Sequence, residues 1–205
     1  MERSRFEITP SHIAGLIAVS VSIYFLITQR DDLSIVAASI YFTLACTTDT
    51  FKSKIPNILN ACLLITGITI STMTLGMQGF FLSLCGLALG IALLLLPYLM
   101  GGMGAGDVKA LGALGALIGP YDLLHVFVYM GFYGGGFALL HYLFQGDIKK
   151  TLREGWLSVC ASALTRDVDY VLPSNPRSRK GTLRFPYAAA IAFGYYSFVH
   201  WGGVL

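Results

Sequence analysis

The 205-residue chain is 55% apolar and only 12% charged, with a mean hydropathy of +0.68. Soluble domains carry about twice that share of charged residues, so the composition indicates a membrane protein and excludes a nucleic-acid binder or a soluble enzyme. The net charge of +3 is too small to indicate a polyanionic partner. None of the four cysteines forms a CxxC pair, and we assign them no metal or redox role.

Apolar segments recur along the chain. A bilayer core of about 30 Å requires about 20 apolar residues per helix. Bounded by charges, prolines or glycine clusters, the candidate spans cover residues 13–28, 33–48, 58–77, 80–100, 108–119, 121–144 and 185–205. The sequence therefore predicts an all-α fold, a polytopic transmembrane helical bundle with about seven crossings, or six if 108–119 does not span. Residues 76–79 are the predicted return turn between the third and fourth spans.

The basic residues favour seven crossings. If every segment crosses, thirteen of the fourteen basic residues face one side and only Arg30 faces the other. The positive-inside rule expects this asymmetry. A re-entrant segment at 108–119 would instead move eight of these charges across the membrane. We therefore predict a multi-pass protein with a cytoplasmic amino terminus.

The longest polar stretch covers residues 145–184. Within it, TLREGWLSVCASAL places apolar residues on one helical face, and the basic, turn-rich LPSNPRSRKG follows. We expect a cytoplasmic loop with an interfacial amphipathic helix, and otherwise a single membrane-embedded domain over residues 1–205. The small-residue pairs Gly86 with Gly90 and Gly131 with Gly135 are predicted helix-packing sites.

Asp49 and Asp107 lie on the same predicted cytoplasmic side, each where a loop meets a span. Ionisable groups at such positions are costly and suggest a function. Aspartate is also a good helix cap, so either residue could be structural. Taken alone, both interpretations stay open.

The surroundings of the two aspartates resemble the motifs of a protease family. Asp49 begins DTFKSKIPN, and Asp107 ends GGMGAGD and begins DVKALGALGAL. In this order, with apolar spans between them, these segments resemble the active-site motifs of the type IV prepilin peptidases, GxGD-type intramembrane aspartic proteases. The carboxy-terminal FPYAAAIAFG is similar to the family's last helix. The resemblance implies that Asp49 and Asp107 are catalytic.

The resemblance also implies the biological setting. It predicts cleavage of the basic leader from single-span prepilins or pseudopilins, at the cytoplasmic face of the bacterial inner membrane, together with pilus or secretion machinery. The chain lacks the cytoplasmic region with paired CxxC motifs that is linked to N-methylation. It therefore resembles the short form found in tight-adherence (Flp-type) systems, and we expect no N-methyltransferase activity.

Peptide hydrolysis without a metal or another cofactor needs one ionised carboxylate to activate water and one protonated carboxyl to polarise the carbonyl. Two aspartates at about 3 Å would share a proton, because like charges that close cannot both ionise. Glycine at 104 and 106 would let a substrate backbone approach Asp107. The predicted substrate-binding residues, which include an interfacial lysine, are Gly104, Gly106, Lys109, Pro56 and Asn57.

Two alternatives belong to other functional classes. In a small proton-linked transporter, the two aspartates would carry a proton or cation, but they lie at one face and no internal repeat relates the halves. In a noncatalytic assembly component of a pilus or secretion system, both aspartates would be dispensable.

Reporter fusions test the predicted topology. Because basic residues mark the cytoplasmic side, fusions at residues 103 and 175 should report the cytoplasm, and fusions at residues 31 and 120 the opposite side. An external report at residue 175 would contradict seven crossings and point to 108–119 as the segment that does not span.

Overall fold

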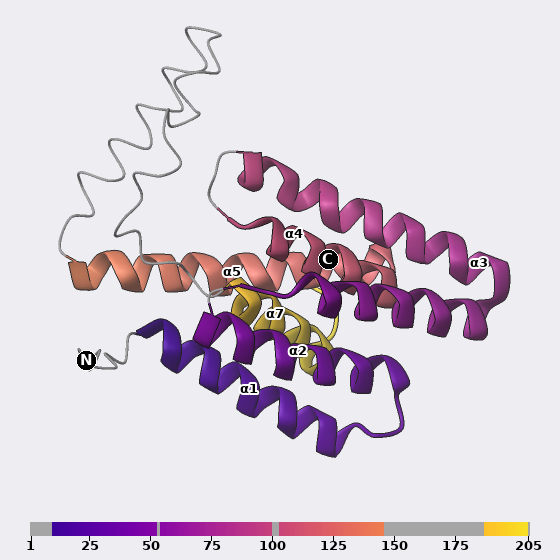
Figure 1. Cartoon of the computed structure of the whole chain (residues 1–205), viewed down its shortest axis with the longest axis horizontal. Helices are drawn as coiled ribbons and strands as arrows, with labels where there is room; N and C mark the ends of the chain where they lie inside the picture. Colours follow the sequence, from indigo (N-terminus) through magenta and orange to yellow (C-terminus); the bar gives the residue numbers. More distant parts are fainter. Residues whose placement is uncertain (1–9, 53, 100–102, 146–186, 205) are drawn as a thin grey trace, which may run out of the picture.

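The computed structural model describes residues 10–52, 54–99, 103–145 and 187–204. These residues form helices and no strands, so the all-α prediction is confirmed (Figure 1). The predicted loop helix within 145–184 lies outside the described residues. The helices are α1 (Pro10–Thr28), α2 (Leu33–Lys52), α3 (Asn57–Leu99), α4 (Ala105–Ile118), α5 (Pro120–Gln145) and α7 (Tyr187–Trp201).

The helix ends follow local sequence signals. At the start of α2, Asp32 Oδ1 accepts a hydrogen bond of 2.8 Å from the Ser34 N–H, as a capping aspartate does. Gly119 has a φ of 85°, which favours glycine, and it separates α4 from α5. Pro120 then begins α5, a position where the missing N–H costs nothing.

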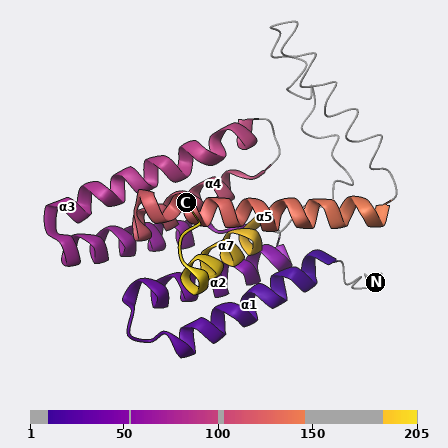
Figure 2. The ribbon, with the colours of Figure 1, turned by 180° about the vertical axis from the view of Figure 1, so that it is seen from behind.

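Helix α3 is a hairpin of two arms. Gly76 has φ 62° and ψ −143°, a conformation open to glycine, and the chain reverses there (Figures 1 and 2). A Cβ atom at Gly79 would overlap the carbonyl oxygen of Ser71, so the arms pack tightly next to the turn. The predicted return turn at 76–79 is thus the bend of α3, and the third and fourth predicted spans are its arms.

Helix α4 is buried against both arms of α3. Gly67 of the first arm lies so close that a Cβ atom there would be 2.8 Å from the Leu117 nitrogen. On the second arm, a Cβ at Gly86 would overlap the Gly115 carbonyl oxygen, and one at Gly90 would lie 2.7 Å from the Leu111 oxygen. The predicted packing role of Gly86 and Gly90 is confirmed.

Aromatic contacts join α1, α2 and α7. The rings of Phe25 and Tyr196 stack with centroids 4.6 Å apart, and the Tyr196 hydroxyl donates a 3.2 Å hydrogen bond to Ser39 Oγ. Helix α7 also packs on α5 through Gly194, where a Cβ would lie 2.8 Å from the Met130 nitrogen. By contrast, Cβ atoms at Gly131 and Gly135 would meet nothing within 4 Å, so their predicted packing role is wrong for contacts between described residues.

Two described helices, α2 and α3, are long and apolar enough to cross a membrane. Helix α1 is apolar but shorter, and α4 has 14 residues, or about 21 Å, which is less than the thickness of a bilayer core. Large apolar side chains such as Met73, which is 83% exposed, suit contact with lipid. The helical part of the predicted bundle is therefore shown, and the count of seven crossings stays a prediction.

Alanine substitutions test the packing of α4. Gly86→Ala should lower the free energy of unfolding by about 1–3 kcal/mol, because its methyl group would overlap the α4 backbone. Gly131→Ala is the matched control, since space is open there and alanine favours a helix by up to about 1 kcal/mol. Thermal unfolding in detergent measures both variants. Equal melting temperatures for the two would contradict the close α3–α4 contact.

Candidate active site

The two predicted catalytic aspartates lie at the same end of the bundle. Asp49 is half-buried in the last turn of α2, and Asp107 is 9% exposed in the first turn of α4. This end, at the left of Figure 1, also holds the connection from α2 to α3. A Cβ atom at Gly106 would lie 3.5 Å from Ile55 Cβ in that connection. The fold therefore brings together two motifs that are distant in the sequence.

Asp107 is held by the first turn of its own helix. Gly104 is the N-cap residue, and its carbonyl oxygen accepts a hydrogen bond of 3.1 Å from the Asp107 N–H. In return, the Gly104 N–H donates to Asp107 Oδ2 at 3.1 Å. Asp107 is thus the third residue of α4 and not its N-cap, although its carboxylate does stabilise the helix start.

Asp107 lies just before the apolar segment 108–119, and the charge of Asp49 affects its pKa. Burial and then repulsion by Asp49 raise the pKa of Asp107 to about 6, against the lowering effect of the Gly104 N–H. Desolvation and a like charge both favour the neutral carboxyl. The two carboxyl groups are therefore close enough for the charge of one to affect the pKa of the other.

A buried hydrogen-bonded chain connects α2, α3 and α4 beside the aspartates. The Tyr41 hydroxyl donates to Asn60 Oδ1 at 2.6 Å, and Asn60 Nδ2 donates to the Gly106 carbonyl oxygen at 3.0 Å. The sequence analysis did not select Tyr41 or Asn60. A polar amide three residues after Asn57, within an apolar helix, was the signal that could have indicated Asn60.

Three predicted substrate-binding residues lie at the rim of this region. Lys109 Nζ donates a 3.2 Å hydrogen bond to Asn57 Oδ1, and both residues are exposed. The Pro56 carbonyl accepts a bond of 3.1 Å from the Leu59 N–H and so supports the start of α3. The structure therefore brings Lys109 and Asn57 together, and it gives Pro56 a structural contact.

The two predicted glycines differ in their need to be small. A Cβ atom at Gly104 would lie 3.3 Å from Asp107 Oδ2, which is a tight contact with the carboxylate. At Gly106 the nearest atom would be 3.5 Å away, an ordinary contact distance. Glycine at 104 therefore leaves room beside the carboxylate, and that requirement is weaker at 106.

No metal site accompanies the aspartates among the described residues, where no group of three or more His, Cys, Asp or Glu residues could hold an ion. Two neighbouring carboxyl groups are sufficient for acid–base hydrolysis. The absence of a cofactor from the mechanism stays a prediction.

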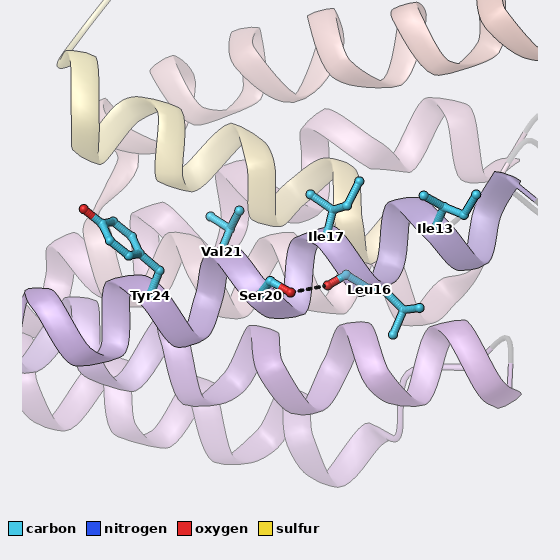
Figure 3. A pocket seen from close by; sticks show the side chains of 6 residues that line it. All are labelled: Ile13, Leu16, Ile17, Ser20, Val21 and Tyr24. Carbon is cyan, nitrogen blue, oxygen red and sulfur yellow. Dashed lines mark hydrogen bonds between the residues drawn. The ribbon is translucent and has the colours of Figure 1, made fainter.

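A shallow apolar groove runs along α1 (Figure 3), and none of the predicted site residues lines it. The Ser20 hydroxyl in it donates a 3.0 Å hydrogen bond to the Leu16 carbonyl oxygen within the same helix. The groove therefore offers mainly apolar contact. Its lining residues are Ile13, Leu16, Ile17, Ser20, Val21 and Tyr24.

The fold and the site define an α-helical protein with apolar helices and two interacting aspartates at one end of the bundle. Among known families, the model of the type IV leader peptidase family matches residues 35–139. This segment covers half of the chain and contains both aspartates. The chain belongs to the type IV leader peptidase family.

Membership in this family implies a peptidase of the type IV leader kind, prepilin substrates and association with a membrane. It confirms the resemblance seen in the sequence. Neither a curated protein nor a solved structure matches the chain.

The pH dependence of stability tests the surroundings of Asp107. Because its pKa is raised in the folded state, the carboxyl contributes stability that is full below about pH 4 and is lost as the pH rises through about 6. Asp107→Asn removes the ionisable group, and the amide oxygen can still accept the Gly104 N–H. The variant should therefore gain melting temperature relative to the wild type as the pH rises from about 4.5 to about 7.5. A difference that does not change with pH would contradict the raised pKa.

Proposed function

We propose that this protein is a membrane aspartic endopeptidase that removes the basic leader peptide from type IV-like (Flp) prepilins at the cytoplasmic membrane face. Family membership supports the substrate class. The observation that carries the catalytic assignment is the interaction between Asp49 and Asp107, because two coupled carboxyl groups supply both the base and the acid of hydrolysis.

In the proposed mechanism, one carboxyl group of the pair is ionised and the other is protonated. Asp49, ionised, removes a proton from water, and the water oxygen attacks the carbonyl carbon of the scissile bond. Asp107, whose burial favours the neutral form, donates a hydrogen bond to the carbonyl oxygen. The C–N bond then breaks, and a proton passes to the leaving amine. The products are a carboxylic acid and an amine, and the carboxyl pair returns to sharing one proton.

The rim of the site provides polar groups for the substrate backbone. Gly104 leaves space next to the Asp107 carboxylate, and Gly106 lies beside it on the same turn. Asn57, which follows Pro56, and Lys109 join α3 to α4 at the exposed edge. In the proposal, these residues hold the extended segment between the leader and the apolar helix of a single-span precursor.

The membrane setting rests on the arrangement of charge. Lys52 and Lys54 lie near Asp49 in the sequence, and Lys109 lies near Asp107, whereas Arg30 follows the opposite end of α1. Basic residues concentrate on the cytoplasmic side of membrane proteins. We place the site at the cytoplasmic face of the bacterial inner membrane, with the amino terminus in the cytoplasm and pilus or secretion machinery as the partner.

We also infer that this chain does not methylate the new amino terminus. Its cysteines, at positions 46, 62, 85 and 160, form no CxxC pair, and paired CxxC motifs accompany methylation in the longer forms of the enzymes it resembles. Mass spectrometry of the cleaved product distinguishes the two cases, because methylation adds the mass of one methylene unit.

Asparagine substitutions test the catalytic pair against the noncatalytic assembly component. Asparagine keeps the shape and capping ability of aspartate but cannot exchange a proton. Asp49→Asn and Asp107→Asn should each lower the rate of prepilin cleavage by at least about 100-fold, with insertion and folding retained. The double variant should be little slower than either single variant, because the pair acts as one unit.

Asp122 provides the matched control. It lies in the first turn of α5, at the opposite end of the bundle, so Asp122→Asn should cleave normally. Normal cleavage by both Asp49→Asn and Asp107→Asn would refute the protease assignment and favour the assembly component. Loss of cleavage only together with loss of folding would favour a capping role.

A further inference from the structure

The Asn60 side chain, on α3, forms hydrogen bonds with both α2 and α4. Its amide oxygen accepts the Tyr41 hydroxyl of α2, and its amide nitrogen donates to the Gly106 carbonyl of α4. Asn60 is 4% exposed and Tyr41 is 5% exposed, so solvent offers neither group a replacement. Removing one of the three groups would leave a buried polar atom of its partner without a hydrogen bond, which is costly. The hydrogen bonds therefore favour one relative position of the three helices.

The two residues bonded to Asn60 are each linked through the backbone to one of the aspartates. Gly106 is bonded to Asp107 through the peptide, so its carbonyl fixes the position of the first turn of α4. On α2, Tyr41 and Asp49 are eight residues apart, a spacing that places them on one face of a helix. The hydrogen bonds of Asn60 therefore connect the supports of the two carboxyl groups.

We propose that Asn60 is a positioning residue which, with Tyr41, sets the separation between Asp49 and Asp107. The expected effect on catalysis rests on the proposed function. The expected effect on the spacing of the helices rests on the hydrogen bonds alone. Asn60 and Tyr41 act through the helices that carry the carboxyl groups and not on the substrate.

The separation matters because two carboxyl groups can share a proton only at short range. A displacement of about 1 Å can lower the rate of an enzyme by up to about 100-fold when the reacting groups lose their alignment. Of the proposed substrate contacts, Lys109 and Asn57 bond to each other at the exposed rim, and only Gly106 shares a hydrogen bond with Asn60. Loss of the Tyr41–Asn60–Gly106 hydrogen bonds should therefore lower kcat much more than it changes KM.

Two tyrosine-to-phenylalanine variants, each of which loses one buried hydroxyl group, provide the kinetic test. Tyr41→Phe removes only the hydroxyl that bonds Asn60, and Tyr196→Phe removes a comparable buried hydroxyl that bonds Ser39, between α7 and α2. Tyr41→Phe should lower kcat about tenfold, with KM within about twofold of wild type, whereas Tyr196→Phe should cleave normally. Equal kcat values in the two variants would overturn the proposal.

Asn60→Leu tests the central residue. It should lower kcat at least as much as Tyr41→Phe does. The double variant Tyr41→Phe/Asn60→Leu should be no slower than Asn60→Leu alone, because both substitutions remove the same hydrogen bond. Independent, multiplying losses would overturn the proposal. If Asn60→Leu does not fold, the pair of tyrosine variants still decides the question.

A distance measurement separates this inference from the proposed function. Spin labels at Lys52→Cys and Lys109→Cys, in a full-length chain whose four native cysteines are replaced, report the spacing of α2 and α4 at exposed positions. Adding Tyr41→Phe should broaden the distance distribution, and adding Tyr196→Phe should not. An unchanged distribution with Tyr41→Phe would overturn the proposal even if the wild type cleaves. Failure of the wild type to cleave would instead refute the proposed function.

Discussion

The close approach of α4 to both arms of α3 is the constraint on which the rest of the structure depends. Gly67, Gly86 and Gly90 let the helix backbones come within contact distance, and α4 is buried from Asp107 to Leu117 apart from the exposed Lys109. In the first turn of α4, Ala105 is exposed, whereas Asp107 and Val108 are buried. The polar groups of this turn must be satisfied locally by Gly104 and across the bundle by Asn60.

That constraint explains why Asp107 can be both buried and oriented. The Gly104 N–H holds one carboxylate oxygen, and the Asn60 amide holds the carbonyl of the preceding residue. The same first turn thus joins the stability of α4 to the chemistry of its carboxyl group, because Asp107 belongs to both.

Much of the fold could be predicted from the sequence, because apolar length and glycine clusters are local signals. The described helices match the predicted spans closely, and the bend at Gly76 falls within the predicted turn. The pairing of Asp49 with Asp107 could also be predicted, because their motifs resemble one family. Gly131 shows the limit of this approach: a small residue indicates that a close contact is possible, but no described residue lies beside it.

The missed residues have a different cause. Tyr41 and Asn60 belong to no motif by themselves, and Gly106 was selected only for its size. Their importance comes from hydrogen bonds between three helices. The sequence pattern of a single helix does not indicate contacts of this kind. In the same way, the exposed Lys109 was interpreted as an interfacial anchor, and only the fold shows that it reaches Asn57.

The bend at Gly76 also affects the order in which the protein is built. Every residue of the proposed site lies in the stretch from Tyr41 to Lys109, and the reversal of α3 returns that stretch to the end of the bundle where the site lies. During synthesis, both aspartates and the residues that hold them are therefore made before the carboxy-terminal half of the chain. Helices α5 and α7 follow only after every part of the proposed site has emerged.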